Sequence, residues 1–314
     1  MTKEELKALG LDWVPELLQG EGEFLAGALR LGLRTDSPNQ KRISSDYARI
    51  KLLSSQLRDK TYHAQLSYLL ESLNLPPRLK SPVHLSITDL FELKCFIYYY
   101  QQLRETVANL PYSFPDLQPV FMLLDPEGSG QPGFRLSPAY SPALQKASRK
   151  LEELGQKLKV MRQKELQQAS QTLLKGGHQP LKNQEFILSR AQTELISLVE
   201  KSGHFLRTAE TVANISYRLA NSPEAEKLLL ELSLVRSAQH EAEEEVLVLL
   251  NRKLQKHFTK LNKAQEISLR LGWDFLRARF GNQYSCCIPK LSTQGKIVLK
   301  GLRNLRQENQ LKEL

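Results

Sequence analysis

Apolar side chains recur at intervals of three and four residues along most of the chain, which is the spacing of helices with one buried face. The segment Gln40–Leu73 contains neither proline nor glycine, and we expect it to form one long helix. Another helix is expected from Ser86 or Thr88 to about Leu110. It is apolar around most of its circumference, which predicts burial within a helical core.

Two much longer helical segments follow. Ala143–Leu174 contains no proline and only one glycine, Gly155, and Pro223–Leu271 contains neither residue type after its first position. At about 1.5 Å per residue, the second segment would extend on the order of 70 Å if unbroken. Ser222 is placed to cap it, and Pro223 suits a first helical position. We expect two arms that lie antiparallel.

Between these arms the pattern changes to an alternation of apolar and polar residues, which is typical of half-buried strands. One strand is expected at Glu185–Arg190 and two more within Phe205–Ala220, with a short helix at about Thr193–Lys201. Further short strands are expected at Phe134–Leu136 and Gly295–Lys300. The predicted fold class is mainly α, with a helical core, two long antiparallel lever helices and a small β-rich clamp-like tip.

The same pattern divides the chain into consecutive parts. They are a helical core at residues 1–142, a first lever helix at 143–175, the tip at 176–221, a return lever helix at 222–271, a return to the core at 272–290 and a last segment at 291–314.

Composition narrows the class of protein. The chain has 314 residues, of which 41% are hydrophobic and 25% are charged, values that argue against a disordered or collagen-like protein. No run of about 18 apolar residues is present, so no membrane span is expected. The first ten residues lack the apolar region of a secretory signal. Three cysteines, an odd number, argue against a disulfide framework, and a cytoplasmic location is the simplest interpretation.

The charge is positive but unevenly distributed. Lys and Arg number 44 against 34 Asp and Glu, a formal net charge of +10, which favours an anionic partner such as nucleic acid. Residues 146–175 hold eight basic residues against three glutamates, whereas residues 224–245 hold seven glutamates against two basic residues. The net positive charge is therefore what is left after acidic segments offset part of the charge of basic segments.

Motifs that would indicate catalysis are absent from the sequence. It contains no G-x-x-x-x-G-K-[ST], H-E-x-x-H, C-x-x-C or G-x-S-x-G, and its six histidines occur singly. Asp89 and Glu92 lie one turn apart on an expected helix, but capping by Ser86 explains them better than acid–base catalysis. Tyr98–Tyr100 could stack on bases, although a buried core helix is the favoured interpretation. We expect no catalytic residue, no metal ligand and no enzymatic activity for this chain.

The order of these features resembles the core, lever and clamp portion of the MutS family of DNA mismatch-repair proteins. Local stretches carry the resemblance: LSITDLFELKCF at Leu85–Phe96, the turn and strand at Leu123–Gly128 and Phe134–Leu144, the clamp-strand positions Glu185–Arg190 and Phe205–Leu219, and the return segments Trp273–Phe280 and Gly295–Leu305.

The resemblance implies a protein that embraces double-stranded DNA through its phosphates, in mismatch repair or in the control of recombination. The family's mismatch-reading domain, with its Phe-x-Glu wedge, has no counterpart here. Residues 291–314 are expected to be the start of a truncated or missing ATPase domain. ATP and magnesium are expected only with that domain, and no cofactor is expected in this chain. A homodimer, as in the full family architecture, stays open.

Basic residues near the expected tip are the candidates for contacts with DNA phosphates, which would be independent of sequence and strongly dependent on salt. They are Lys175, His178, Lys182, Arg190, Arg207 and Arg218. The alternative function is a helical scaffold that binds another protein through its long arms. The acidic stretch Glu241–Glu245 favours this alternative if it lies on the inner surface of the arms.

Overall fold

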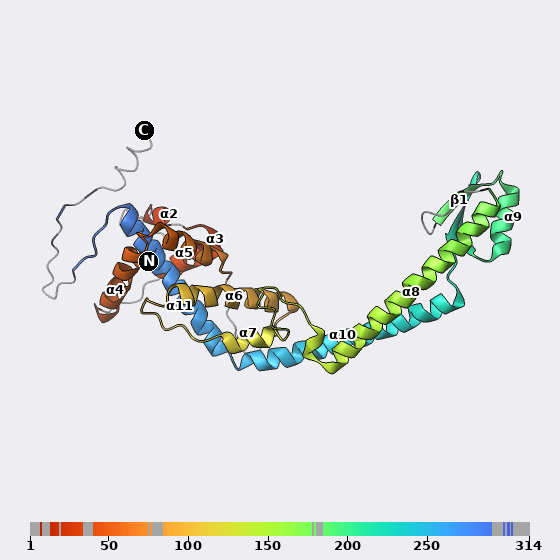
Figure 1. The fold of residues 1–314 in the computed structure, drawn as a ribbon. Helices are drawn as coiled ribbons and strands as arrows, with labels where there is room; N and C mark the ends of the chain where they lie inside the picture. The colour runs from red at the N-terminus through yellow and green to blue at the C-terminus, as the bar shows by residue number, and fades with distance from the viewer. Residues whose placement is uncertain are drawn as a thin grey trace, which may run out of the picture. The chain divides into compact units, whose positions relative to one another are not determined.

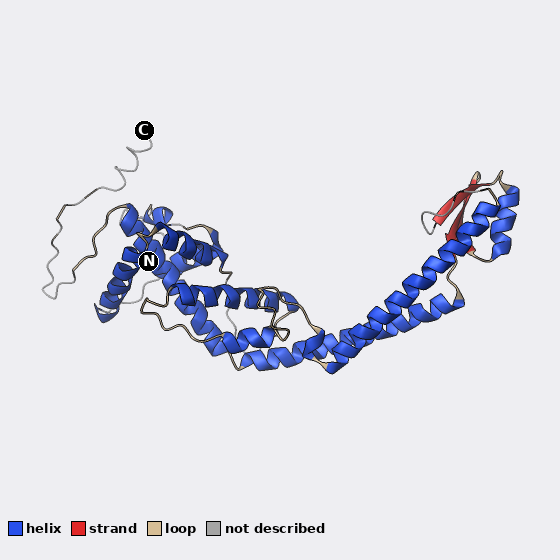
Figure 2. Cartoon of the chain, in the orientation of Figure 1, coloured by secondary structure: helices blue, strands red, loops and turns tan. Residues whose placement is uncertain are grey.

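The chain is mainly helical, with a small antiparallel sheet, as the computed structural model shows (Figures 1 and 2). This confirms the predicted fold class. The structure describes residues 7, 13–18, 20–33, 40–74, 76, 84–177, 179, 185–290, 298, 300, 301 and 303. Among these residues, no helix is long and apolar enough to cross a membrane.

The elements follow one another in this order: α2 (Val14–Leu18), α3 (Gly22–Leu33), α4 (Gln40–Gln56), α5 (Lys60–Ser72), α6 (Ile87–Thr106), α7 (Gln118–Leu124), the 3-10 helix η1 (Pro138–Tyr140), α8 (Pro142–Lys175), β1 (Glu185–Ser189), α9 (Thr193–Ser202), β2 (Phe205–Glu210), β3 (Asn214–Leu219), α10 (Pro223–Gln255) and α11 (Phe258–Gln283). They form two compact units. The helical body comprises residues 1–135 and 248–314, and the arm unit comprises residues 136–247.

The helical body is organised around α11, which packs against α3 and α4, while α5 packs against α3 and α6. Phe24, Phe96 and Phe275 are among its fully buried side chains. Gly272 lies within α11, where an added Cβ would come within 3.0 Å of Ala28 Cβ and of the Phe24 ring. Glycine at this position therefore lets the backbones of α3 and α11 approach closely.

Helix α6 begins as its sequence predicts. The Ser86 hydroxyl accepts a hydrogen bond from the Asp89 amide at 3.2 Å, and Asp89 accepts one from the Ser86 amide at 2.8 Å. This reciprocal capping box confirms the structural interpretation of Asp89. Tyr100 is fully buried and donates from its hydroxyl to the Pro115 carbonyl at 2.7 Å, which confirms that this helix belongs to the core.

Two long helices expected from the sequence are each interrupted. The segment Gln40–Leu73 is divided because Asp59 caps α5, accepting hydrogen bonds from the amides of Thr61 at 2.8 Å and Tyr62 at 3.4 Å. The segment Pro223–Leu271 is divided at a tight turn, where the His257 amide donates to the Leu254 carbonyl at 2.8 Å. The predictions of unbroken helices were wrong at these two points.

Two expected strands have different outcomes. Phe134–Leu136 is irregular, and the prediction of a strand there was wrong, because no described strand lies beside it to complete a ladder. Its preceding residue, Gly133, instead uses its carbonyl to accept a hydrogen bond from Lys94 at 2.9 Å. Most of Gly295–Lys300 lies outside the described residues, so the strand expected there stays a prediction.

In the arm unit, α8 and the first part of α10 run antiparallel (Figure 1). Glu165 of α8 accepts a hydrogen bond from the Ser222 amide at 3.2 Å, and Lys150 forms an ion pair with Glu231 at 2.8 Å. Contacts nearer the start of α8 thus involve residues farther along α10, which is the pattern of an antiparallel helix pair. A seam of Leu154, Leu232 and Val235 holds this helix pair together.

A sheet with strand order β1-β3-β2 follows α8 and precedes α10 in the arm unit. Both strand pairs are antiparallel, with Ile187 opposite Ser216 in one and Leu206 opposite Arg218 in the other. A bulge between Arg207 and Ala209 gives β2 one extra residue. This sheet and α9 confirm the β-containing tip predicted between the two long helices, which we call the tip.

Candidate nucleic-acid interface

One face of the tip sheet is buried because alternate strand residues are apolar. Leu188, Ile215 and Tyr217 pack against α9 and the end of α8, where the buried partners include Leu195 and Leu173. The Tyr217 hydroxyl donates to Glu200 of α9 at 3.0 Å, and burial, followed by the Glu200 carboxylate, raises the pKa of Tyr217. The sheet and α9 therefore form one small folded layer.

The other face of the tip sheet is exposed. Its residues come from the alternate register positions, where Ile187 pairs with Ser216 and Leu206 pairs with Arg218. Ile187 is 63% exposed and Leu206 is 50% exposed. This face combines apolar, hydroxyl and cationic groups, a mixture able to contact the sugar-phosphate backbone of a nucleic acid.

Arg190 and Arg207, two of the predicted phosphate contacts, converge on one carboxylate. Arg190 forms an ion pair with Glu210, and Arg207 forms another with Glu210 at 2.6 Å. Each of these arginines is about half exposed, so neither is lost to the interior. Glu210 nevertheless neutralises part of their charge, a partner that the sequence alone did not indicate.

Lys175 and Arg218 are exposed and take part in no described ion pair. Lys175 is the last residue of α8, where a cation also interacts favourably with the helix dipole. Arg218 lies on β3, on the exposed face of the sheet. The two other predicted contacts, His178 and Lys182, lie outside the described residues.

Helix α8 adds a larger set of cations. The sequence showed them as part of a basic segment, but they were not predicted to contact DNA. The exposed basic residues of α8 are Lys146, Arg149, Lys150, Lys157, Lys159, Lys164 and Lys175. Of these, only Lys150 forms an ion pair within the described part of the chain, with Glu231. The hydrogen bond and charge of Lys150 lower the pKa of Glu231. Most of the positive charge on α8 is thus available to solvent or to a partner.

An open groove of about 670 Å³ lies between α8 and α10 within the arm unit. Val160, Met161 and Leu228 supply apolar surface, while Lys157 and Lys164 line it from α8. This groove was not predicted from the sequence, because its residues come from two helices that are separated in the chain by the tip.

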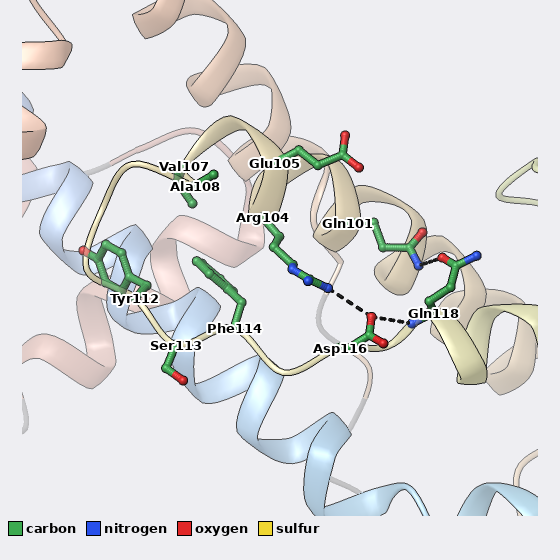
Figure 3. Close-up of a pocket in the computed structure, with 10 residues that line it drawn as sticks. All are labelled: Gln101, Arg104, Glu105, Val107, Ala108, Tyr112, Ser113, Phe114, Asp116 and Gln118. Carbon is green, nitrogen blue, oxygen red and sulfur yellow. Dashed lines mark hydrogen bonds and ion pairs between the residues drawn. The ribbon is translucent and has the colours of Figure 1, made fainter.

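A hollow of about 560 Å³ lies in the helical body beside the end of α6 (Figure 3). Arg104 forms an ion pair with Asp116 at 3.0 Å, and Gln101 donates to Gln118 at 2.7 Å. The Gln118 amide and Arg104 lower the pKa of Asp116. These polar groups tie the end of α6 to the loop that follows it and to the start of α7, which is a structural role.

A buried ionic network crosses the helical body. Asp274, which is fully buried on α11, accepts hydrogen bonds from Arg49 at 2.9 Å, from the Tyr112 hydroxyl at 2.7 Å and from Arg277. Burial and the Asp274 carboxylate both raise the pKa of Tyr112. Burial alone would lower the pKa of Arg49, but Asp274 raises it. The network therefore ties α4, the loop after α6 and α11 together within the core of the helical body.

No group of three or more histidine, cysteine, aspartate or glutamate side chains able to hold a metal ion occurs among the described residues. No model of a known protein family matches the chain, and a search of curated proteins found no significant match.

Proposed function

We propose that the arm unit binds double-stranded DNA through its phosphates, as a MutS-like protein of mismatch repair or recombination control. The observation that carries the proposal is the exposed positive charge of α8, most of which has no described ion-pair partner. The succession of a helical body, a long helix, a small sheet and a returning helix supports the same proposal, because it resembles the order of core, lever and clamp in the MutS family.

In this proposal, cations of α8 and of the tip contact the backbone, and the exposed sheet face lies against the sugar-phosphate surface. Lys175 and Arg218 contribute directly, whereas Arg190 and Arg207 share their charge with Glu210. The proposal assigns no catalytic step and no bound nucleotide to the residues of this chain, and it places the protein in the cytoplasm.

The test is binding of a labelled DNA duplex across a salt series from roughly 50 to 200 mM. The logarithm of the affinity should fall linearly with the logarithm of the salt concentration, with a slope of about 0.9 per phosphate contact. Replacing Lys157 and Lys164 with glutamine should reduce that slope by about two, and Lys150→Gln, which removes a cation already paired with Glu231, is the matched control. No binding at low salt would exclude the proposal.

Glu210 gives a second test with the opposite sign. The substitution Glu210→Gln releases Arg190 and Arg207 from their shared carboxylate, so DNA affinity should rise several-fold and the salt slope should steepen. If affinity is unchanged while the α8 variants lose binding, the DNA contacts lie on α8 and the tip arginines are structural.

A protein-binding scaffold is the second candidate function. It is favoured by the acidic part of α10, where Glu241, Glu244 and Glu245 are exposed and would repel DNA nearby. Absence of duplex binding even at low salt would favour this candidate.

A further inference from the structure

Helix α10 carries a second stripe of residues outside its seam with α8. Ala225, Leu232 and Val235 are buried on the seam side. The second stripe recurs at intervals of three and four residues and consists of exposed side chains: Lys227, Leu230, Leu234, Ala238, Glu241 and Glu245. Because successive helical residues are separated by about 100°, these six positions fall within a sector of roughly 80°. We call this set the outer stripe.

The outer stripe is apolar at its centre and oppositely charged at its two ends. Leu230 and Leu234 lie one turn apart and retain 66% and 70% of their exposure. Lys227 precedes them, and Glu241 and Glu245 follow. None of these three charged residues takes part in an ion pair within the described part of the chain. Covering the leucines would therefore bury apolar surface and bring unpaired charges into reach.

We propose that the outer stripe joins two copies of this chain as an antiparallel helix pair. With the two-fold axis at Leu234, this residue faces Leu234 of the second copy, and Leu230 faces Ala238. The same register sets Lys227 of each copy opposite Glu241 of the other. One patch then serves both copies, as an isologous interface requires.

The order of charges selects a second copy as the occupant, and selects its direction. A parallel pair in register would oppose Lys227 with Lys227 and Glu241 with Glu241, which is repulsive. The antiparallel pair turns both contacts into ion pairs without any other change. The inference does not depend on DNA binding, and its test is carried out on the full chain without DNA.

Charge exchange provides the first test, by sedimentation velocity over a concentration series. Lys227→Glu or Glu241→Lys alone should weaken the homodimer by about tenfold or more, because each places like charges together twice. The double variant should recover the parental affinity. An equimolar mixture of the two single variants should form a heterodimer, because both of its contacts are then attractive.

Disulfide trapping tests the register. In a background with Cys286→Ser and Cys287→Ser, which removes the two exposed cysteines, Leu234→Cys should give a covalent dimer on oxidation. Leu230→Cys is the matched control, because its two copies would be offset by about 12 Å along the helices, beyond the reach of a disulfide. The background variant without a new cysteine controls for Cys95.

A chain that is monomeric at every concentration would overturn the proposal. So would a dimer whose affinity is unchanged by both charge reversals, or one that is trapped equally well through positions 230 and 234.

Discussion

Asp274 shows how much one buried side chain can depend on distant partners. Its carboxylate accepts hydrogen bonds from Arg49, Tyr112 and Arg277, and it has no contact with solvent. Two of these partners lie 225 and 162 positions away in the sequence. These two partners therefore reach the carboxylate only when the helical body is folded.

Replacing Asp274 with alanine should lower the free energy of unfolding by about 3–5 kcal/mol, because the buried Arg49 would keep only Asp46 as a partner and Arg277 would lose its carboxylate. Tyr112→Phe removes only one hydrogen bond to the same carboxylate and should cost about 1.5–3 kcal/mol. Urea unfolding of both variants, followed by tryptophan fluorescence, checks this order. Equal losses would show that the charge of Asp274 is of no special importance.

Asp125 makes the stability of the helical body depend on acid pH. Burial alone would raise the pKa of Asp125, but hydrogen bonds from Ser129, the Gly130 amide and Lys94 lower it from 3.8 to about 2. A lowered carboxyl pKa stabilises the fold fully above the unfolded value, and this contribution is lost as pH falls from 3.8 to about 2.

The variant Asp125→Asn should be less stable than the parent at neutral pH, because it leaves the buried Lys94 ammonium without its carboxylate. Its urea midpoint should then change less than that of the parent between about pH 4 and pH 2. Parallel pH curves for the two proteins would contradict the assignment.

Residue-scale predictions from the sequence succeeded where the partner is local. The Ser86–Asp89 capping box joins positions three residues apart, and the Ser222 hydroxyl accepts from the Ala225 amide at 3.2 Å, as the start of α10 required. The Asp274 network and the neutralisation of Arg207 by a carboxylate shared with Arg190 were missed. The contacts of Asp274 with Arg49 and Tyr112, and that of Glu210 with Arg190, could not be read from local spacing, because tertiary folding brings these groups together.

At the scale of the element, two helical glycines have different structural roles, and the sequence alone could not distinguish them. Gly32 of α3 lies against Trp273, where an added Cβ would come within 2.1 Å of the indole ring. Gly155 lies in the interior of α8, where an added Cβ would have no neighbour within 4 Å. The first glycine permits close packing, whereas the second only weakens its helix.

We therefore expect opposite effects from the same substitution. Gly32→Ala should destabilise the helical body by about 1–3 kcal/mol through overpacking. Gly155→Ala should stabilise the arm unit by about 0.5–1 kcal/mol through lower backbone entropy in the unfolded chain. Chemical denaturation, followed by fluorescence for Gly32→Ala and by circular dichroism for Gly155→Ala, measures both. A loss of stability in both variants would contradict the open surroundings of Gly155.

The elements predicted from hydrophobic periodicity were confirmed in type more reliably than in extent. The tip strands, α9 and the long helix α8 agree with the sequence pattern. The ends of α4 and α10 do not, because Asp59 and His257 interrupt segments that lack proline and glycine. Conversely, α11 continues through Gly272, since packing against α3 requires a small residue there.

At the scale of the whole molecule, the two compact units have separate cores. Among the described residues of the arm unit, the buried clusters are small, one in the tip and one along the α8–α10 seam. Both tryptophans of the chain, Trp13 and Trp273, belong to the helical body. Fluorescence therefore reports on one unit, whereas far-ultraviolet circular dichroism reports on the helices of both.

Unfolding in urea should consequently give different curves for the two probes. Circular dichroism should show a transition at lower urea that tryptophan fluorescence lacks, because the arm unit has the smaller core. Gly155→Ala should move only that transition, and Gly32→Ala only the one seen by fluorescence. Coincident curves in the parent protein would show that the units unfold together.

The net charge of +10 also takes its meaning from the whole molecule. Within the arm unit, the basic helix α8 lies beside the acidic first half of α10, and Lys150 and Glu231 mark where the opposed charges meet. Most other cations of α8, and Glu241, Glu244 and Glu245 of α10, are exposed to solvent. The sequence predicted these segments and their antiparallel pairing, but it did not indicate which side chains form the seam.

The bulge in β2 bears on how this protein can change length during evolution. Thr208 is the extra residue between Arg207, opposite Tyr217, and Ala209, opposite Ser216. Losing this residue would leave every other pair of the ladder intact and each side chain on its present face. Losing one residue from the middle of β3 would instead move every later side chain of that strand to the opposite face of the sheet. Relatives should therefore tolerate a one-residue gap at position 208 and should keep the length of β3 fixed.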